Sequence, residues 1–210
     1  MNPDIVERSI EEFEYHVDMA RWMGYGKSWH DGCKINVHIS GKRGPEGLLK
    51  EFPKLSTEAR NLITIENDEM GHGLEHTLEV AHKIALVLDI HHHWIRAEEY
   101  IQPNDDRVKK VIDSWRGVRP TLHYSYSRDE HLAVANLGDK THTEMHDIKM
   151  LLERGCKKQK LRAHSDLLPN RAVNDWALSF GEHFDIQTEA KGKNIAAEQL
   201  YRQAVENSVI

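Results

Sequence analysis

The chain has 210 residues, 30% of them charged, and a formal net charge of −6 at pH 7. This length allows a substantial hydrophobic core, and the negative charge excludes an overall basic field of the kind that attracts nucleic acids, unless bound cations change the local charge. Cys33 and Cys156 are too few for a disulfide framework, and without a signal peptide or a long apolar run we expect a soluble cytoplasmic protein with no membrane contact.

The first predicted element is a helix at the start of the sequence. Asn2 is a suitable N-cap, and Pro3 suits the first helical position. One apolar face follows at helical spacing, made of Ile5, Ile10, Phe13, Val17 and Ala20. We therefore expect the chain to begin with a helix and not with a strand.

Strands and helices alternate along the rest of the chain. The predicted strands cover about residues 34–40, 61–67, 84–91, 119–125 and 184–190. The predicted helices cover about residues 45–60, 73–83, 105–115, 143–159, 171–181 and 193–206, the first of them weakened by Pro53. This alternation is typical of parallel strands joined by helical crossovers.

The pattern predicts an α/β fold, namely a TIM-type (β/α) barrel with about five of its eight strands. We expect residues 1–210 to form a single partial barrel domain that lacks the first three strands. An unclosed barrel exposes strand edges near 34–40 and 184–190, and free edges invite pairing or aggregation. We therefore hypothesise a fragment or a split-protein half, which a second chain supplying the missing strands could complete.

Each predicted strand ends in a side chain that can bind a metal ion. These side chains are His38, Glu66, Asp89, His123 and Glu189. The active site of an α/β barrel lies at the carboxyl ends of its strands, so we expect them to converge. Mixed imidazole and carboxylate ligands suit zinc, manganese or iron better than calcium. Two or more such ions can activate water and stabilise both oxygens of a phosphodiester displacement.

Histidines outside the strands add two candidate ligands. Three histidines follow Asp89, of which we take His92 as a ligand and expect a packing or orienting role among His91 and His93. His164, in Ala-His-Ser-Asp, is the other candidate. Nearby lysines are interpreted as a solvated helix end that could also touch phosphate: Lys157, Lys158 and Lys160.

Together these segments resemble the UV damage endonuclease family, a branch of the endonuclease IV and xylose isomerase-like barrels. The similarity runs from about residue 2 to about residue 200 and depends on the order and spacing of several motifs. These are the helix Ser9 to His16, Val37-His38-Ile39-Ser40-Gly41, Ile65-Glu66-Asn67-Asp68, Leu88-Asp89-Ile90-His91-His92-His93, Arg119 to Ser125, His164-Ser165-Asp166 and Asp185 to Lys193.

The resemblance implies a nuclease that nicks damaged double-stranded DNA immediately 5′ to UV-induced and other lesions. The products would carry a 3′-hydroxyl and a 5′-phosphate, and the nick would start excision repair. The family's metal ligands carry over onto His38, Glu66, Asp89, His92, His123, His164 and Glu189.

The resemblance also implies roles for these ligands. Glu66 would bridge two ions, Asp89 and Glu189 would complete the central site, and His92 with His164 would hold a further ion. The catalytic candidates are Glu66, Asp89 and Glu189. Manganese is the favoured ion, in two or three sites, with zinc or magnesium as alternatives.

The sequence departs from the family pattern at two places. The family has a lysine, which can be carbamylated at the metal site, two residues before the histidine that matches His123, and here Thr121 stands there. The family's amino-terminal third, which supplies another metal-binding histidine and a glutamine and aromatic pair that probes damaged DNA, has no counterpart in this sequence.

Three functions therefore remain open. The first is a lesion-directed, metal-dependent endonuclease. The second is an inactive or complementing fragment of such an enzyme. The third is a sugar isomerase or epimerase of the related barrel. Two segments argue against it because they resemble the endonuclease branch, namely His91-His92-His93 and the ending Glu189-Ala190-Lys191.

Overall fold

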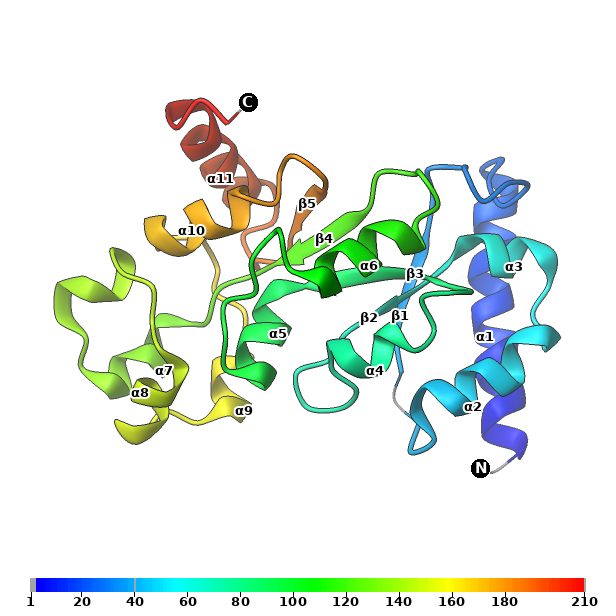
Figure 1. The fold of residues 1–210 in the computed structure, drawn as a ribbon, viewed down its shortest axis with the longest axis horizontal. Helices are drawn as coiled ribbons and strands as arrows, with labels where there is room; N and C mark the ends of the chain where they lie inside the picture. The colour runs from blue at the N-terminus through cyan, green and yellow to red at the C-terminus, as the bar shows by residue number, and fades with distance from the viewer. Residues whose placement is uncertain (1–2, 40, 210) are drawn as a thin grey trace.

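The computed structural model describes residues 3–39 and 41–209. At its centre lies one five-stranded sheet of order β1-β2-β3-β4-β5, with every neighbouring pair parallel (Figure 1). The strands are β1 (Ile35–His38), β2 (Ile63–Glu66), β3 (Ala85–Asp89), β4 (Thr121–Tyr124) and β5 (Asp185–Thr188). The predicted α/β class is confirmed: the chain forms a partial TIM-type barrel, with β1 and β5 as its two edges.

Helices connect and flank these strands. The α-helices are α1 (Pro3–Trp22), α2 (Gly44–Glu51), α3 (Thr57–Leu62), α4 (Leu74–Leu78), α5 (Ile90–Ala97), α6 (Asp106–Ser114), α7 (Asp129–Leu132), α8 (Ile148–Glu153), α9 (Lys158–Leu161), α10 (Arg171–Leu178) and α11 (Asn194–Glu206). Three 3₁₀ turns are η1 (Phe52–Lys54), η2 (Ala133–Ala135) and η3 (Gly138–His142). None of the helices in the described ranges is long and apolar enough to cross a bilayer.

The hydrophobic core joins the sheet to the helices packed on it. All residues of β2 and β3 are buried, and α4 and α6 pack against β3 and against each other. The predicted face of α1 is turned inward at Phe13, Val17 and Ala20. The proposed N-cap of α1, Asn2, lies outside the described residues, as does residue 40 at the end of the first predicted strand. That the whole chain forms one domain stays a prediction.

The third strand is shorter than predicted, and its last predicted residues are helical. β3 ends at Asp89, and Ile90 begins α5, so the three consecutive histidines lie on a helix and not at a strand end. The side chain of Asp89 causes this change, because it accepts a hydrogen bond from the backbone N–H of His92 at 2.7 Å and caps the new helix.

The helix predicted over 45–60 is divided into α2, η1 and α3. Pro53 has no N–H to donate to a preceding carbonyl, so the α-helix changes into a 3₁₀ turn there. Ser56 then caps α3 through its hydroxyl, which accepts a hydrogen bond from the N–H of Ala59 at 3.1 Å. α3 leads directly into β2 at Ile63, two residues later than predicted.

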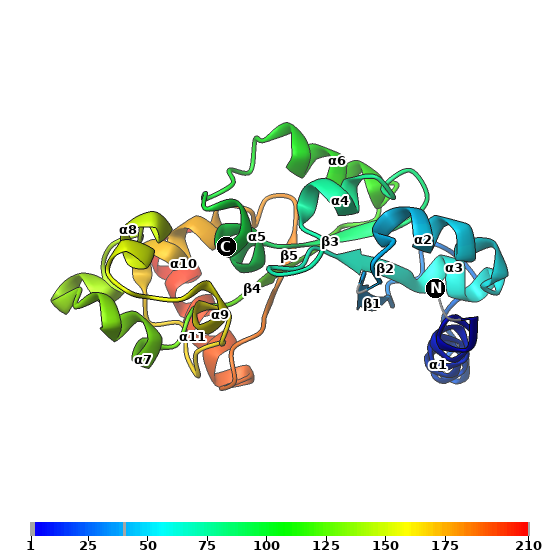
Figure 2. The same cartoon turned by 90° about the horizontal axis from the view of Figure 1, so that it is seen from below.

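The helix predicted over 143–159 is also wrong. α8 ends at Glu153, Gly155 adopts a left-handed conformation (φ 97°), and α9 begins only at Lys158. Both belong to the segment between Ser127 and His164, which leaves the sheet after β4 and also contains α7; we call this segment the excursion. Ser127 and His164 form an antiparallel bridge where this excursion departs and returns. In both views α7 and α8 lie at the opposite end of the molecule from α1, and α9 lies between them and the sheet (Figures 1 and 2).

Candidate metal centre

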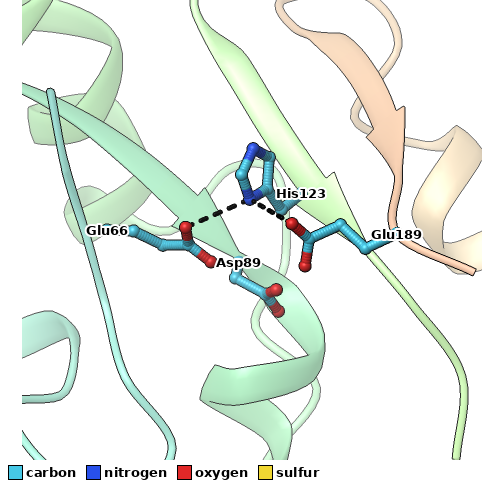
Figure 3. A group of neighbouring side chains, drawn as sticks. All are labelled: Glu66, Asp89, His123 and Glu189. Carbon is cyan, nitrogen blue, oxygen red and sulfur yellow. Dashed lines mark ion pairs between the residues drawn. The ribbon is translucent and has the colours of Figure 1, made fainter. Parts of the chain in front are cut away.

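The carboxyl ends of four neighbouring strands bring four candidate ligands together. Glu66, Asp89 and His123 end or nearly end β2, β3 and β4, and Glu189 directly follows β5 (Figure 3). One ligand atom from each side chain lies within 4.8 Å of the others, and three of the four residues are buried. The predicted convergence of these residues is therefore present in the structure.

His123 stands between two of the carboxylates. Its Nδ1 lies 3.2 Å from Glu66 Oε2 and 3.2 Å from Glu189 Oε1. Three buried polar atoms of this cluster have no hydrogen-bond partner among the described residues: Glu66 Oε1, Asp89 Oδ2 and His123 Nδ1. Each of these atoms lies 3.2 to 3.5 Å from an oppositely charged group but makes no hydrogen bond within the described ranges, which is costly for a buried polar atom, and both atom types are ligands of divalent metals. The donor set therefore fits one or more divalent cations.

Local hydrogen bonds hold the carboxylates in place. The side chain of Asn67 accepts a hydrogen bond from the N–H of Asp89 at 2.9 Å and donates one to the carbonyl of Asp89 at 2.8 Å. The amide of Asn36 in β1 donates to Glu66 Oε2, and the hydroxyl of Thr64 donates to Asn36 Oδ1 at 3.0 Å. Glu66 and Asp89 are therefore held by neighbouring strands as well as by their own.

His92 and His164 both have one ring nitrogen tied to the backbone. Nδ1 of His92 donates to the carbonyl of Asn67, and Nδ1 of His164 donates to the carbonyl of Glu189, each at 3.0 Å. Each ring can therefore offer Nε2 as a ligand, an arrangement that metal-binding histidines commonly show. The two ring centroids are 6.2 Å apart, and His92 Nδ1 lies 3.4 Å from Glu66 Oε1.

His38 joins the site from the edge strand. Its Nε2 lies 3.6 Å from Glu66 Oε2, and its Nδ1 lies 4.0 Å from a carboxylate oxygen of Asp68. All seven predicted ligands thus lie in one connected region, although whether each binds a metal stays a prediction. Thr121 is half-buried in β4, on the same face of the strand as His123, so the family's lysine position points towards this site but carries a short hydroxyl side chain.

His91 and His93 have structural partners and do not join the cluster. The hydroxyl of Ser127 donates to the carbonyl of Leu161 at 2.7 Å, so His91 Nε2 donates to that hydroxyl at 3.0 Å while Ser125 donates to His91 Nδ1 at 2.7 Å. Burial and the nearby His92 hold the pKa of His91 well below its usual value, as expected for a neutral ring. His93 pairs instead with Glu99 at 3.0 Å.

One buried carboxylate of this region was not predicted from the sequence. Glu69 has 3% of its side chain exposed, and its Oε2 lies 3.4 Å from His92 Nε2. Its Oε1 pairs with Arg162, which belongs to the excursion after β4. Glu69 lies in a loop without periodicity, and its partner is distant in sequence, so no local pattern could have identified it.

The crowded charges shift the pKa values of the cluster. Burial, with help from Glu66 and Glu189, raises the pKa of Asp89 to about 7 against the opposing effect of His92. Burial alone would lower the pKa of His92, but Asp89, Glu69 and Glu66 raise it to about 9. Burial would likewise raise the pKa of Glu66, but His123, His38 and His92 outweigh it and lower the pKa. Without a cation, the region therefore retains protons between its carboxylates and imidazoles.

Comparisons with known proteins agree with this fold. The family model for UV-endonuclease UvdE matches residues 1–209. The UV DNA damage endonuclease of Bacillus cereus (strain B4264) is 24% identical over 210 residues, which are 94% of this chain and 56% of that protein. The putative UV-damage endonuclease of Acanthamoeba polyphaga mimivirus is 29% identical over 133 residues, 59% of this chain and 39% of that protein.

A solved structure extends the similarity to the fold. The crystal structure of SacUVDE superposes with a TM-score of 0.67 at 21% sequence identity, covering 100% of this chain and 62% of that chain. The chain thus spans about half the length of the curated relatives it matches most fully. With the family model matching nearly its whole length, the chain belongs to the UV-endonuclease UvdE family.

Proposed function

We propose that the cluster at the carboxyl edge of the sheet is the metal centre of a DNA repair endonuclease that nicks damaged double-stranded DNA 5′ to UV-induced and other lesions. The observation that carries this proposal is the convergence of ligand atoms from Glu66, Asp89, His123 and Glu189, three of which are buried without a hydrogen bond among the described residues. Family membership supports the endonuclease over the sugar isomerase, because the relatives are UV damage endonucleases.

The proposed ligands divide between two parts of the site. The resemblance implies that Glu66 would be shared between two ions, and its two oxygens do face different histidines: Oε2 faces His123 and His38, and Oε1 faces Nδ1 of His92. Asp89 and Glu189 would complete the central set, and His92 with His164 would hold a further ion through their Nε2 atoms. Manganese is the proposed ion, with zinc or magnesium as alternatives.

The proposed phosphodiester cleavage would use side chains that are already in place. A divalent cation at this rim would polarise a phosphoryl oxygen and lower the pKa of a bound water. The carboxylates of Glu66, Asp89 and Glu189 are the proposed catalytic groups, since they hold the reacting centre and can accept the proton of the attacking water. Hydrogen bonds from the Asn36 amide to Glu66 and from the His92 N–H to Asp89 keep the first two carboxylates in place, which limits reorganisation during the reaction.

The open sheet edges support a second candidate, a complementing fragment. β1 and β5 are edge strands of a sheet with five strands, whereas a closed barrel of this type has eight. A second polypeptide that supplies further strands would close the sheet and add surface for the DNA duplex. In this alternative the present chain carries the metal centre and needs that partner to turn over.

An incision assay tests the proposal. Purified chain with manganese is expected to nick a UV-irradiated duplex and to leave the undamaged duplex intact, whereas Glu66→Ala and Asp89→Ala abolish nicking. Glu79→Gln is the matched control, because Glu79 is an exposed carboxylate beyond α4, on the side of the sheet where β3 begins. Nicking that survives both alanine substitutions would overturn the site assignment. Nicking that appears only when a second chain is added would favour the complementing fragment.

A further inference from the structure

The excursion between Ser127 and His164 contributes a side chain to the candidate metal centre. Its last helix, α9, is held close to the sheet by three contacts. Leu161 is fully buried, and its carbonyl accepts the hydrogen bond from the hydroxyl of Ser127. Lys158 Nζ lies 2.7 Å from Glu98 Oε1 at the end of α5. The residue that follows α9, Arg162, is therefore held in a defined position.

Arg162 meets the site through its Nε atom. Nε pairs with Oε1 of the buried Glu69, whose other oxygen faces His92 Nε2. The Arg162 side chain is nevertheless 48% exposed. Among the described residues, Nη1 and Nη2 have no hydrogen bond or ion pair of their own, so with about half of the side chain exposed they are available to a ligand. A guanidinium oriented in this way can bind a phosphate with two parallel hydrogen bonds.

The candidate metal centre is acidic, so a phosphate that binds there needs a positively charged side chain nearby. The carboxylates of Glu66, Asp89, Glu189 and Glu69 gather at this rim, and the chain as a whole carries −6. A phosphodiester must approach this acidic region, so fixed cations beside it would lower the electrostatic cost. Lys157 and Lys160 are exposed on either side of Lys158 and extend the positive charge next to Arg162.

We propose that Arg162, oriented by Glu69, binds a backbone phosphate of the DNA strand at the rim of the metal centre, and that the exposed Lys157 and Lys160 extend this contact. This inference rests on the proposed function, because it takes DNA as the ligand. Arg162 is a binding and positioning residue in this account.

Binding of a fluorescein-labelled, UV-irradiated duplex, measured by anisotropy in EDTA at several salt concentrations, tests the inference without cleavage. Arg162→Gln is expected to weaken binding roughly tenfold and to reduce the salt dependence by about one phosphate contact. Arg162→Lys should keep the salt dependence and bind several-fold more weakly, because lysine lacks the planar fork. Arg202→Gln is the matched control, an exposed, ion-paired arginine of α11, and should bind as the wild type does.

A double variant separates phosphate binding from a structural role. Arg162→Gln leaves the buried Glu69 with His92 as its remaining charged partner and is expected to lower Tm, whereas Glu69→Gln with Arg162→Gln removes the excess buried charge and should restore Tm. If Arg162 binds phosphate, the double variant still binds DNA weakly. Recovery of full affinity in the double variant would overturn the inference.

Other outcomes distinguish this inference from the proposed function. If the wild type nicks damaged DNA but Arg162→Gln binds with unchanged affinity and salt dependence, the inference alone is wrong. The inference alone is also wrong if the wild type nicks damaged DNA but does not bind the duplex in EDTA. A wild type that neither nicks nor binds DNA would overturn both.

Discussion

The backbone N–H of His92 donates a hydrogen bond to Asp89 Oδ1 at 2.7 Å, so the residue that ends β3 also begins α5. The Oδ2 atom of the same carboxylate is buried in the candidate metal centre and makes no hydrogen bond among the described residues. Asp89 thus combines a structural function as a helix cap with a proposed function as a ligand. The two functions use different oxygens, which makes them separable by substitution.

Replacing Asp89 by asparagine should separate them. The side-chain oxygen of asparagine can still cap α5, while the new amide removes a buried negative charge next to Glu66 and Glu189. We expect the metal-free variant to be more stable than the wild type by about 1 to 3 kcal/mol at pH 8. Urea unfolding in EDTA measures this. Manganese should no longer raise its Tm, and a variant less stable than the wild type in EDTA would contradict the account.

Two adjacent histidines should respond differently to alanine substitution. His91→Ala leaves a cavity, leaves the Ser125 hydroxyl unpaired and removes one of the two partners of the Ser127 hydroxyl, so we expect a loss of about 2 to 4 kcal/mol in the free energy of unfolding. Metal binding by the folded protein should persist. His92→Ala should instead weaken manganese binding, because it removes a proposed ligand. Unfolding curves with and without manganese distinguish the two, and loss of metal binding in His91→Ala with retention in His92→Ala would reverse the assignment.

The stability of the metal-free protein should decrease as pH rises above neutrality. The pKa of Asp89 is raised from 3.8 to about 7 and that of His92 from 6.5 to about 9, so these two groups bind more protons in the folded chain than in the unfolded chain between about pH 4 and pH 9. Burial lowers the pKa of His91, His93 and His146, which has the opposite effect at lower pH and ends above about pH 7.5, where a free imidazole is also neutral. The contribution of His92 is complete below pH 6.5 and is lost as pH approaches 9. Tm measured in EDTA from about pH 7.5 to pH 9 should therefore fall.

Manganese should oppose this trend. A cation displaces the protons that the cluster retains, so metal binding strengthens as pH rises. The increase in Tm on adding manganese is expected to be larger at pH 8 than at pH 6. An increase that shrinks over this range would show that the ion binds elsewhere.

The edge strands should make the isolated chain prone to association. β5 alternates exposed and half-buried residues, and β1 has half-buried residues along most of its length, so both can pair with another strand. Sedimentation velocity should show association that increases with concentration. Gln187→Lys, which places a charge on an exposed position of β5, should reduce it. A monomer at all concentrations, melting in one cooperative transition, would instead support a single domain that is stable alone.

Parallel topology is the reason that most of the candidate site could be predicted. Strands such as β2 are short apolar runs, and the residue that ends each one must lie at a common edge of the sheet. Glu66, Asp89, His123 and Glu189 could therefore be grouped before their distances were known. His164 lies outside any strand, and only the resemblance to the family connected it to the others.

The parts that could not be predicted depend on contacts between distant residues. Ile90 to His93 has no clear periodicity, and only the cap from Asp89 makes it helical. The burial of Glu69 depends on Arg162, which follows a long excursion without a regular pattern. Pro53 predicts a weakened helix, but the start of a new helix depends on the capping hydroxyl of Ser56, which the helical periodicity does not indicate.

Calorimetric titration of the metal-free chain with manganese tests the central claim most directly. The account predicts saturable binding to the wild type and to Glu79→Gln at pH 8, and loss of that binding in Asp89→Asn and Glu66→Gln variants that remain folded. Absence of saturable binding, or equal binding by all four proteins, would contradict a metal centre built from these strand ends.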